Sequence, residues 1–316
     1  MADISSVARW LRERDNYLIL THRRPDGDTI GCAVALCRAL KNMGKTAWCL
    51  PNEDATALFT PYLDGTQAPE GFTPDFVISV DIASEGLFPD SAACYKGKVD
   101  LAIDHHPSQE YFAGETLVEA DKAACGEILY RVICELTDMT PEIALPLYVA
   151  LATDTGCFMY SNTSPNTHRI AADLMEQGIQ SAWVNKRHFR TKTYTRLRLE
   201  GRIMENMQLC HGGRTAIGSI SLADLADLGA KEEDLEDISA FIGQLEGVHT
   251  GVTVRETKPN VCKISVRTGD DLNATKVCGL LGGGGHAAAA GCTIEASVSE
   301  ARKAILNAIE TVMAQN

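Results

Sequence analysis

The feature that most constrains the fold is a short polar loop between two apolar segments. The apolar run 17–20 predicts a buried strand, and the amphipathic run 30–43 predicts the helix that follows it. One imidazole, two carboxylates and two turn residues lie between these runs: His22, Asp26, Asp28, Pro25 and Gly27. In open α/β sheets, ligands bind at the carboxyl ends of the strands, where this loop would lie. Because two acids in one turn repel each other unless a cation lies between them, the loop predicts a divalent metal site. The alternative is that Asp28 only caps the helix.

Apolar runs and helical patterns alternate along the first half of the chain. Strands are predicted at 17–20, 45–50, 76–80, 99–103 and 116–119, and helices at 30–43, 122–136, 141–152 and 167–177. This alternation is typical of an α/β domain in which a parallel sheet is flanked by helices.

The rest of the sequence predicts a linker and a smaller second domain. Seven cationic side chains lie between Val184 and Met207, which we interpret as one long basic helix; the alternative is a solvated helix face. Strands at 215–220, 248–255, 261–266 and 292–295 and helices at 222–228, 238–245, 273–281 and 299–313 predict an α/β domain with a mixed sheet. We therefore expect a catalytic domain over 1–184, a linker helix over 185–207 and a substrate-binding domain over 208–316.

Composition narrows the class of protein. The chain has 316 residues, which suggests about two domains, and a formal net charge of −13. This acidity disfavours binding to long or duplex nucleic acid, which depends on neutralising phosphates, but it permits a short anionic substrate. No apolar run of about 18 residues is present, so no membrane span is expected. The 11 cysteines include no C-x-x-C pair, which favours a reducing, cytoplasmic location.

Further polar residues come directly after apolar segments: Asp81, Asp104, His105, His106 and Asp154. Together with the acids and imidazole of the first loop, they suit two divalent ions with Asp81 as the bridging ligand. Mn²⁺ is the natural choice for a mixed His/Asp set, and zinc, which favours thiolate and imidazole, fits less well. Two metals about 3.5–4 Å apart are typical of phosphoester hydrolysis. The sequence contains no G-x-S-x-G elbow and no Walker A motif that would favour another chemistry.

These motifs resemble those of the DHH phosphoesterase family. The catalytic part of the resemblance is carried, in order, by His22-x-x-x-Asp26-x-Asp28, Asp81, Asp104-His105-His106 and Asp154. A second part is similar to the signature of the family's DHHA1 substrate domain: Gly282-Gly283-Gly284-Gly285-His286 with Ala289-Ala290-Gly291. The resemblance covers nearly the whole chain. It is greatest to oligoribonucleases that also dephosphorylate 3′-phosphoadenosine 5′-phosphate (pAp).

The resemblance implies roles for individual residues. One Mn²⁺ would be held by His22, Asp26 and Asp81. The other would be held by Asp28, Asp81, His105 and Asp154. His106 would contact the scissile phosphate or the leaving oxygen, and Asp104 would orient the histidines.

The resemblance also implies a substrate-binding set in the second domain. The far end of the nucleotide would be bound by His286, the amides of Gly284 and Gly285, and Arg267. The glycine run has an independent interpretation as an anion-binding concavity. Alternatively, the glycine run is a flexible hinge. For Arg267, the alternative is an ordinary surface residue of a strand and not a phosphate ligand.

The chain departs from the family pattern at three places. Arg23 and Arg24 replace small or amide residues beside the metal loop and add positive charge at its mouth. Cys32 lies where a serine is common. Ala287 and Ala288 follow the histidine of the glycine-rich signature, where larger polar side chains are usual.

The predicted function is a Mn²⁺-dependent phosphoesterase, with Mg²⁺ or Co²⁺ as alternative ions, that cleaves short RNA or DNA oligonucleotides and pAp. Alternatives with the same fold are a cyclic or linear dinucleotide (c-di-AMP, pApA) phosphodiesterase and a RecJ-like single-strand exonuclease. A family II pyrophosphatase would lack the glycine–histidine signature. A non-catalytic nucleotide-binding module is the alternative from another class, and the intact acids and imidazoles disfavour it. For the quaternary structure, the hypothesis is a homodimer.

Overall fold

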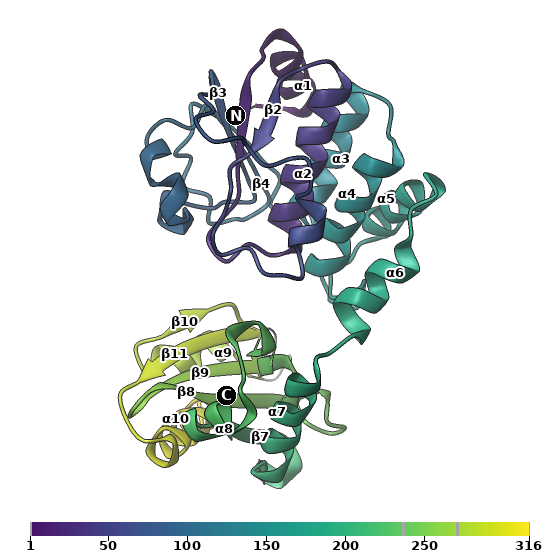
Figure 1. Ribbon diagram of the computed structural model, residues 1–316. Helices are drawn as coiled ribbons and strands as arrows, with labels where there is room; N and C mark the ends of the chain where they lie inside the picture. The colour runs from purple at the N-terminus through teal and green to yellow at the C-terminus, as the bar shows by residue number, and fades with distance from the viewer. Residues whose placement is uncertain (1, 236–237, 270–271, 316) are drawn as a thin grey trace. The chain divides into compact units, whose positions relative to one another are not determined.

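The chain folds as two compact units, shown in Figure 1 as a computed structural model that describes residues 2–235, 238–269 and 272–315. Unit 1 is Met1–Thr191 and unit 2 is Lys192–Asn316. Each unit has its own sheet and its own apolar core. Within the described ranges, no helix combines the length and apolar character that crossing a bilayer requires.

Unit 1 contains a five-stranded sheet in which every neighbouring pair is parallel. Its strands are β1 (Tyr17–Leu20), β2 (Ala47–Cys49), β3 (Phe76–Val80), β4 (Leu101–Asp104) and β5 (Glu115–Val118). Their spatial order is β2-β1-β3-β4-β5, so the direction of winding reverses between β1 and β3. In sheets of this order, ligands bind outside the carboxyl ends of the strands at that reversal.

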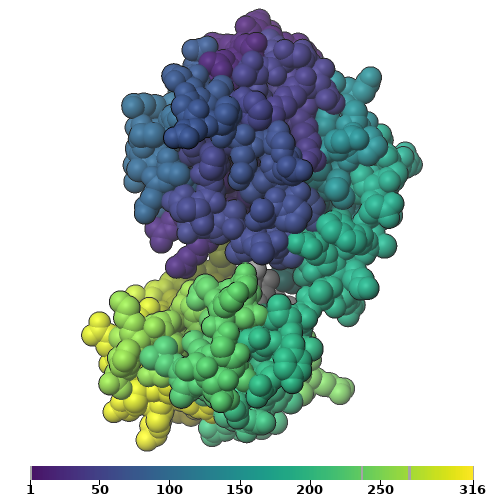
Figure 2. Space-filling view, in the orientation of Figure 1, coloured from purple at the N-terminus to yellow at the C-terminus, as the bar shows by residue number. Residues whose placement is uncertain are grey.

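Both faces of this sheet are covered. The helices of unit 1 are α1 (Ile4–Glu13), α2 (Gly27–Asn42), α3 (Cys125–Leu136), α4 (Pro141–Asp154), α5 (Pro165–Glu176) and α6 (Ser181–Asn185). Tyr17 and Ile19 of β1 pack into the core that includes α2, α3 and α4, which lie together beside the sheet (Figure 1). Leu18 and Leu20, on the opposite face, pack with Phe88. Short 3₁₀ turns lie at Thr60–Tyr62, Glu85–Leu87 and Asp90–Tyr95. Atoms of the segment after β2 form much of the visible surface of this unit (Figure 2).

The start of α2 shows why the first loop has its shape. The Asp26 carboxylate accepts hydrogen bonds from the backbone N–H groups of Asp28 and Thr29, so Asp26, and not Asp28, is the N-cap. Gly31 lies where α2 crosses α4, and a Cβ there would come within 2.3 Å of the Pro146 carbonyl oxygen. Gly27, in the first turn of α2, likewise lies against the side chain of Thr153 in the last turn of α4, so these two helix ends are neighbours.

Unit 2 contains a six-stranded mixed sheet in the order β10-β11-β9-β8-β7-β6. Its strands are β6 (Gln208–Cys210), β7 (Thr215–Ile220), β8 (Thr250–Lys258), β9 (Val261–Thr268), β10 (Gly284–Gly285) and β11 (Ala289–Ile294). Among the described strands of this second sheet, only the β7–β8 pair is parallel. The helices are α7 (Tyr194–Glu205), α8 (Leu222–Leu228), α9 (Ala274–Gly279) and α10 (Val298–Met313). Short 3₁₀ turns lie at His211–Gly213, Glu232–Leu235, Ile238–Ala240 and Ile242–Gln244.

The predicted fold class is confirmed, with a parallel sheet in unit 1 and a mixed sheet in unit 2. The single long helix predicted over 184–207 is wrong, because α6 continues only into a π-helical turn at Lys186–Arg190 and α7 begins at Tyr194. The helix predicted over 238–245 is also wrong, because two short 3₁₀ turns occupy that stretch. The domain limits at 184 and 208 stay a prediction, whereas the two compact units meet between Thr191 and Lys192.

Candidate metal centre

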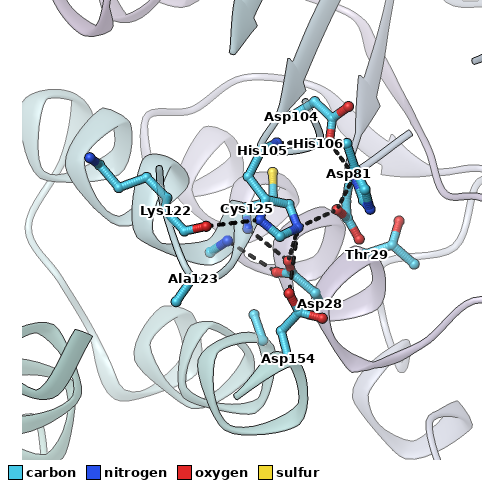
Figure 3. A network of polar contacts seen from close by, with 12 residues as sticks. Asp28, Thr29, Asp81, Asp104, His105, His106, Lys122, Ala123, Cys125 and Asp154 are labelled. Carbon is cyan, nitrogen blue, oxygen red and sulfur yellow. Dashed lines mark hydrogen bonds and ion pairs between the residues drawn. The ribbon is translucent and has the colours of Figure 1, made fainter. Parts of the chain in front are cut away.

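The polar residues that follow three neighbouring strands of unit 1 meet at one edge of its sheet. They follow β1, β3 and β4, and two further acids come from the first turn of α2 and the last turn of α4: His22, Asp26, Asp81, Asp104, His105, His106, Asp28 and Asp154. Figure 3 shows those from the ends of β3 and β4, together with Asp28 and Asp154. All eight were expected near this edge, and the structure brings all eight there.

Among the described residues, three overlapping groups of nitrogen and oxygen ligands lie at this edge. Two of them share no residue, and the third, Asp81, His105 and His106, takes Asp81 from one and His105 from the other. The first ligand group is His22, Asp26 and Asp81, and the second is Asp28, His105 and Asp154. In each group the ligand atoms lie within 4.8 Å of one another. His22 Nε2 is 3.5 Å from Asp26 Oδ1 and 3.8 Å from Asp81 Oδ2. A cluster of imidazole and carboxylate ligand atoms with this spacing suits one divalent cation.

The second ligand group is centred on the Nε2 atom of His105. This atom is 3.7 Å from Asp28 Oδ2 and 3.4 Å from Asp154 Oδ2. It is also 3.4 Å from Asp81 Oδ1. Dashed lines in Figure 3 mark these contacts of His105. Asp81 therefore presents one carboxylate oxygen to each group, which is the arrangement that a bridging ligand requires.

Hydrogen bonds orient all three histidines with Nδ1 toward an oxygen acceptor. His22 Nδ1 is 2.9 Å from the Arg23 carbonyl, His105 Nδ1 is 3.1 Å from the Lys122 carbonyl, and His106 Nδ1 is 2.8 Å from Asp104 Oδ1. In a neutral ring these bonds place the proton on Nδ1 and leave the Nε2 lone pair free. For His22 and His105, that lone pair faces the carboxylates, as metal-binding imidazoles require.

The carboxylates are crowded and largely removed from water. Burial, followed by the charge of Asp26, raises the pKa of Asp28 to about 7. Burial, followed by the charge of Asp28, raises the pKa of Asp154 to about 7. Burial and the charges of Asp28 and Asp26 hold the pKa of Asp81 well above its ordinary value. Such an array is unfavourable in its ionised form until cations balance it.

Two further observations at Asp81 fit a metal. Its Oδ1 atom is buried and, within the part of the chain that the structure describes, has no hydrogen-bond donor. Its backbone has φ 59°, a left-handed conformation that is strained for an aspartate. Strain of this kind persists at functional sites where a side chain must be aimed at a ligand. Oxygen and imidazole donors without a thiolate in the groups fit a hard or borderline divalent ion.

The predicted substrate residues lie in unit 2, on β9, on β10 and in the turn that follows β10, and β11 lies between these two strands. Arg267 of β9 pairs with Ala289 of β11, and Gly285 of β10 pairs with Ala290 on the other side of β11. A Cβ on Gly285 would come within 2.6 Å of the Ala289 carbonyl oxygen, so this position requires glycine. His286 is exposed in the turn that follows β10. The residues Gly284 and Gly285 are thus paired strand residues.

Comparison with known proteins identifies the family. Residues 16–152 match the DHH family, N-terminal domain, and residues 216–315 match the DHHA1 domain. The chain is 32% identical over 294 residues to the bifunctional oligoribonuclease and PAP phosphatase NrnA of Thermus thermophilus, covering 92% of this chain and 88% of that protein. The chain belongs to the DHH family. The resemblance drawn from the motifs is thereby confirmed, and this DHH protein is a hydrolytic enzyme of the phosphoesterase class.

Two more relatives extend the comparison. The NrnA protein of Bacillus subtilis is 24% identical over 297 residues, which are 92% of this chain and 93% of that protein. The crystal structure of an exopolyphosphatase-related protein from Bacteroides fragilis superposes with a TM-score of 0.87 at 22% identity, covering 99% of this chain and 96% of the other. The second likeness shows that the DHH fold is shared.

Two features that support the DHH site have no signal in the sequence pattern. The first is the N-terminus of α3, where the N–H groups of Cys125 and Gly126 donate to the Asp28 carboxylate at 2.7 and 3.0 Å. The second is Gln109, a buried residue whose Nε2 donates to Asp104 Oδ2 at 2.8 Å and to the Ile82 carbonyl at 2.8 Å. Asp104 in turn bonds the ring of His106, whereas the ring of His105 is held by Lys122. Gln109 therefore joins the DHH triplet to the segment after Asp81.

We expect the substitution Gln109→Leu to lower kcat/KM by about 10–100-fold, as is typical when a group that supports a metal or catalytic ligand is removed. Asp104 Oδ2 would lose its donor, so more of the negative charge of this carboxylate would stabilise the protonated ring of His106. The alkaline limb of the pH profile should therefore move upward. Thermal melting would show how much of the loss is due to unfolding. Gln177→Leu, at the end of α5, is the matched control. A lower rate with an unmoved pH limb would contradict this positioning role.

Proposed function

We propose that this DHH phosphoesterase is a two-metal hydrolase, with Mn²⁺ as its preferred ion, that acts on very short oligonucleotides and on pAp. His22, Asp26 and Asp81 would hold one ion, and Asp28, Asp81, His105 and Asp154 the other. The observation that carries the proposal is the buried Asp81 carboxylate, which offers one oxygen to each ligand group. When bound, two such ions supply Lewis acidity that activates water and neutralises phosphate charge.

His106 is the group best suited to proton transfer at the leaving oxygen. Its Nδ1 is bound to Asp104, which leaves Nε2 to face the substrate, and 38% of its side chain is exposed. The hydrogen bond and charge of Asp104 outweigh partial burial and raise the pKa of His106 above its ordinary value. A protonated imidazole near neutral pH can donate a proton to the leaving oxygen. Asp104 orients the ring and stabilises its charge.

The choice of short substrates is supported by charge and by the relatives. A chain with a net charge of −13 lacks the excess of cations that long nucleic acid requires. Both NrnA relatives are named as oligoribonucleases and PAP phosphatases. In unit 2 we propose that Arg267, His286 and the amides of Gly284 and Gly285 bind the far end of the substrate.

A turnover profile tests the proposal. Purified protein with Mn²⁺ is expected to convert pAp to AMP, and RNAs of two to five nucleotides to mononucleotides. Cyclic di-AMP should be turned over far more slowly than linear pApA, and long single strands more slowly still. The products would be quantified by chromatography with and without EDTA. A preference for cyclic di-AMP would favour the signalling phosphodiesterase, a preference for long strands would favour the RecJ-like exonuclease, and no metal-dependent product would favour a binding module.

A further inference from the structure

Two adjacent arginines lie in the loop that carries His22 and Asp26 of the first ligand group. Arg23 and Arg24 are both exposed and separate two residues of the first ligand group, His22 and Asp26. Within the described residues, neither guanidinium forms an ion pair or a hydrogen bond. The side chain of Lys122, whose carbonyl binds His105, is by contrast paired with the carboxylates of Asp121 and Glu119.

The backbone of this turn is held by bonds that do not need arginine side chains. The Arg23 N–H donates to the Leu87 carbonyl at 2.7 Å, and the Arg24 N–H donates to the Asp54 carboxylate at 3.1 Å. Any residue other than proline would make the same two bonds. The fold therefore gives no reason for two long cationic side chains here.

At Arg24, the fold gives a reason against arginine. Its φ is 51°, in the left-handed region that glycine and asparagine tolerate and that other side chains adopt at a cost. When a residue beside an active site has an unfavourable backbone conformation, its side chain often serves to bind a ligand and not to stabilise the fold.

The charge balance of the site indicates what that role is. Four ligand carboxylates, those of Asp26, Asp28, Asp81 and Asp154, offset the four positive charges of two divalent ions. With both ions bound, the site therefore has little net positive charge with which to bind a substrate that carries more than one phosphate. The chain as a whole is also acidic. The two arginines supply positive charge at this edge. The Arg24 Cα lies no more than about 7.6 Å from the Cα atoms of His22 and Asp26, two residues away along the chain.

We propose that Arg23 and Arg24 bind a non-scissile phosphate of the substrate, the one next along the nucleotide from the phosphate under attack. The enzyme would thereby select nucleotides that carry at least two phosphate groups. Guanidinium groups suit this role because their paired N–H donors match phosphate oxygens. In pAp the phosphate concerned is the 5′-phosphate, and in pApA it is the terminal phosphate. The residues proposed in unit 2 would then bind the nucleoside part of the far end. The inference rests on the proposed function and adds its substrate selectivity.

The test compares two substrates that share a scissile bond. Both pAp and 3′-AMP carry a 3′-phosphate, but only pAp carries the second phosphate. The ratio of kcat/KM for pAp to that for 3′-AMP should exceed one in the wild type and fall about 10–100-fold in the Arg23→Ala/Arg24→Ala protein. Arg169→Ala, an exposed arginine of α5, is the control and should keep the wild-type ratio. An unchanged ratio in the double variant would overturn the inference.

Single variants of Arg24 separate charge from backbone strain. Arg24→Asn suits the left-handed backbone and keeps the N–H bond to Asp54, so Tm should rise by about 2–4 °C while the pAp:3′-AMP ratio falls. Arg24→Lys keeps the charge and should keep most of the ratio. A higher Tm in Arg24→Asn with an unchanged ratio would show that the arginine has no part in selectivity.

Failure of the inference and failure of the proposed function give different results. If the wild type cleaves neither substrate with Mn²⁺, the proposed function is wrong and the inference falls with it. If the wild type cleaves pAp and the double variant shows the same substrate ratio, only the inference is wrong.

Discussion

Replacing Asp81 by asparagine is expected to lower kcat/KM on pAp and on dinucleotides by about 10³-fold or more, the scale at which loss of charge stabilisation at a reacting centre is felt. The reason is that one carboxylate serves both ligand groups, with Oδ2 toward His22 and Oδ1 toward His105. An amide of the same shape offers a weaker oxygen to one group and a nitrogen donor to the other. Both groups are therefore weakened by a single change.

The same substitution is expected to stabilise the metal-free protein. Burial and the charges of Asp28 and Asp26 raise the pKa of Asp81, so the fold without metal is more stable when this residue is neutral. In EDTA, the Tm of Asp81→Asn should equal or exceed that of the wild type. With Mn²⁺, only the wild type should gain substantially in Tm. This opposite effect on activity and stability identifies a residue that is kept for binding a cation.

The controls for this prediction are simple. Asp64→Asn removes an exposed acid from the same unit and should leave activity and metal-induced stabilisation at wild-type values. The assay would measure initial rates on pAp and melting curves with EDTA and with Mn²⁺. Retention of more than a tenth of the activity by Asp81→Asn would mean that the two ligand groups do not share this residue.

The sequence predicted the centre of this site because strand ends are easy to locate. Asp81 and His105 follow apolar runs, and the carboxyl ends of parallel strands share one edge of a sheet. To predict that those strand ends lie close together, only the fold class is needed, and not the positions of the side chains. Asp154 was placed by the same reasoning at the end of an apolar helix, and the contact of Gly27 with Thr153 shows that this helix end lies beside α2.

The supporting residues could not be predicted in this way. Gln109 lies in irregular structure after β4, and no periodicity marks a buried amide that bonds a carboxylate. The pairing of Asp28 with the amides of α3 spans 97 and 98 residues along the chain. Such contacts depend on how two elements pack, and local sequence does not encode the packing.

The linker prediction failed for a different physical reason. Charge runs and helical propensity gave no sign of an interruption, yet Thr193 caps a new helix by accepting the N–H of Arg196. The basic face is also partly paired, because Lys192 and Arg196 both contact the buried Glu200. A threonine within a charged run is only a weak sequence signal for the start of a helix. Tertiary contacts decide whether a helix begins there.

Removal of divalent ions is expected to abolish turnover and to lower the Tm of unit 1 by about 5–10 °C, as a ligand at about 100 times its Kd would predict. The size of this Tm difference should depend on pH. In the metal-free fold, Asp28 and Asp154 have pKa values of about 7, whereas in the unfolded chain they titrate near 4.

The sign of the pH dependence follows from proton binding. Between about pH 4 and pH 7, the folded metal-free protein holds protons on these acids that the unfolded chain has released, so its stability falls as pH rises. Despite burial, the hydrogen bond and charge of Asp26 raise the pKa of His22, which adds stability at low pH that is lost as pH rises through that pKa. Cation binding replaces the protons on the acids and on His22. The gain in Tm from Mn²⁺ should therefore grow from pH 5 to pH 7 and then level off.

Melting curves at pH 5, 6, 7 and 8, with EDTA and with Mn²⁺, measure this gain directly. Asp154→Asn removes one of the two raised carboxyl groups, so its metal-free stability should fall less steeply over the same range. Calorimetry should detect protons released on binding of Mn²⁺ at pH 6 and fewer at pH 8. A metal-induced Tm shift that is constant across this range, without proton release, would mean that the cation binds away from these carboxylates. The acids at the strand ends would then be a buried cluster with no metal to balance it, which their crowding makes physically unfavourable.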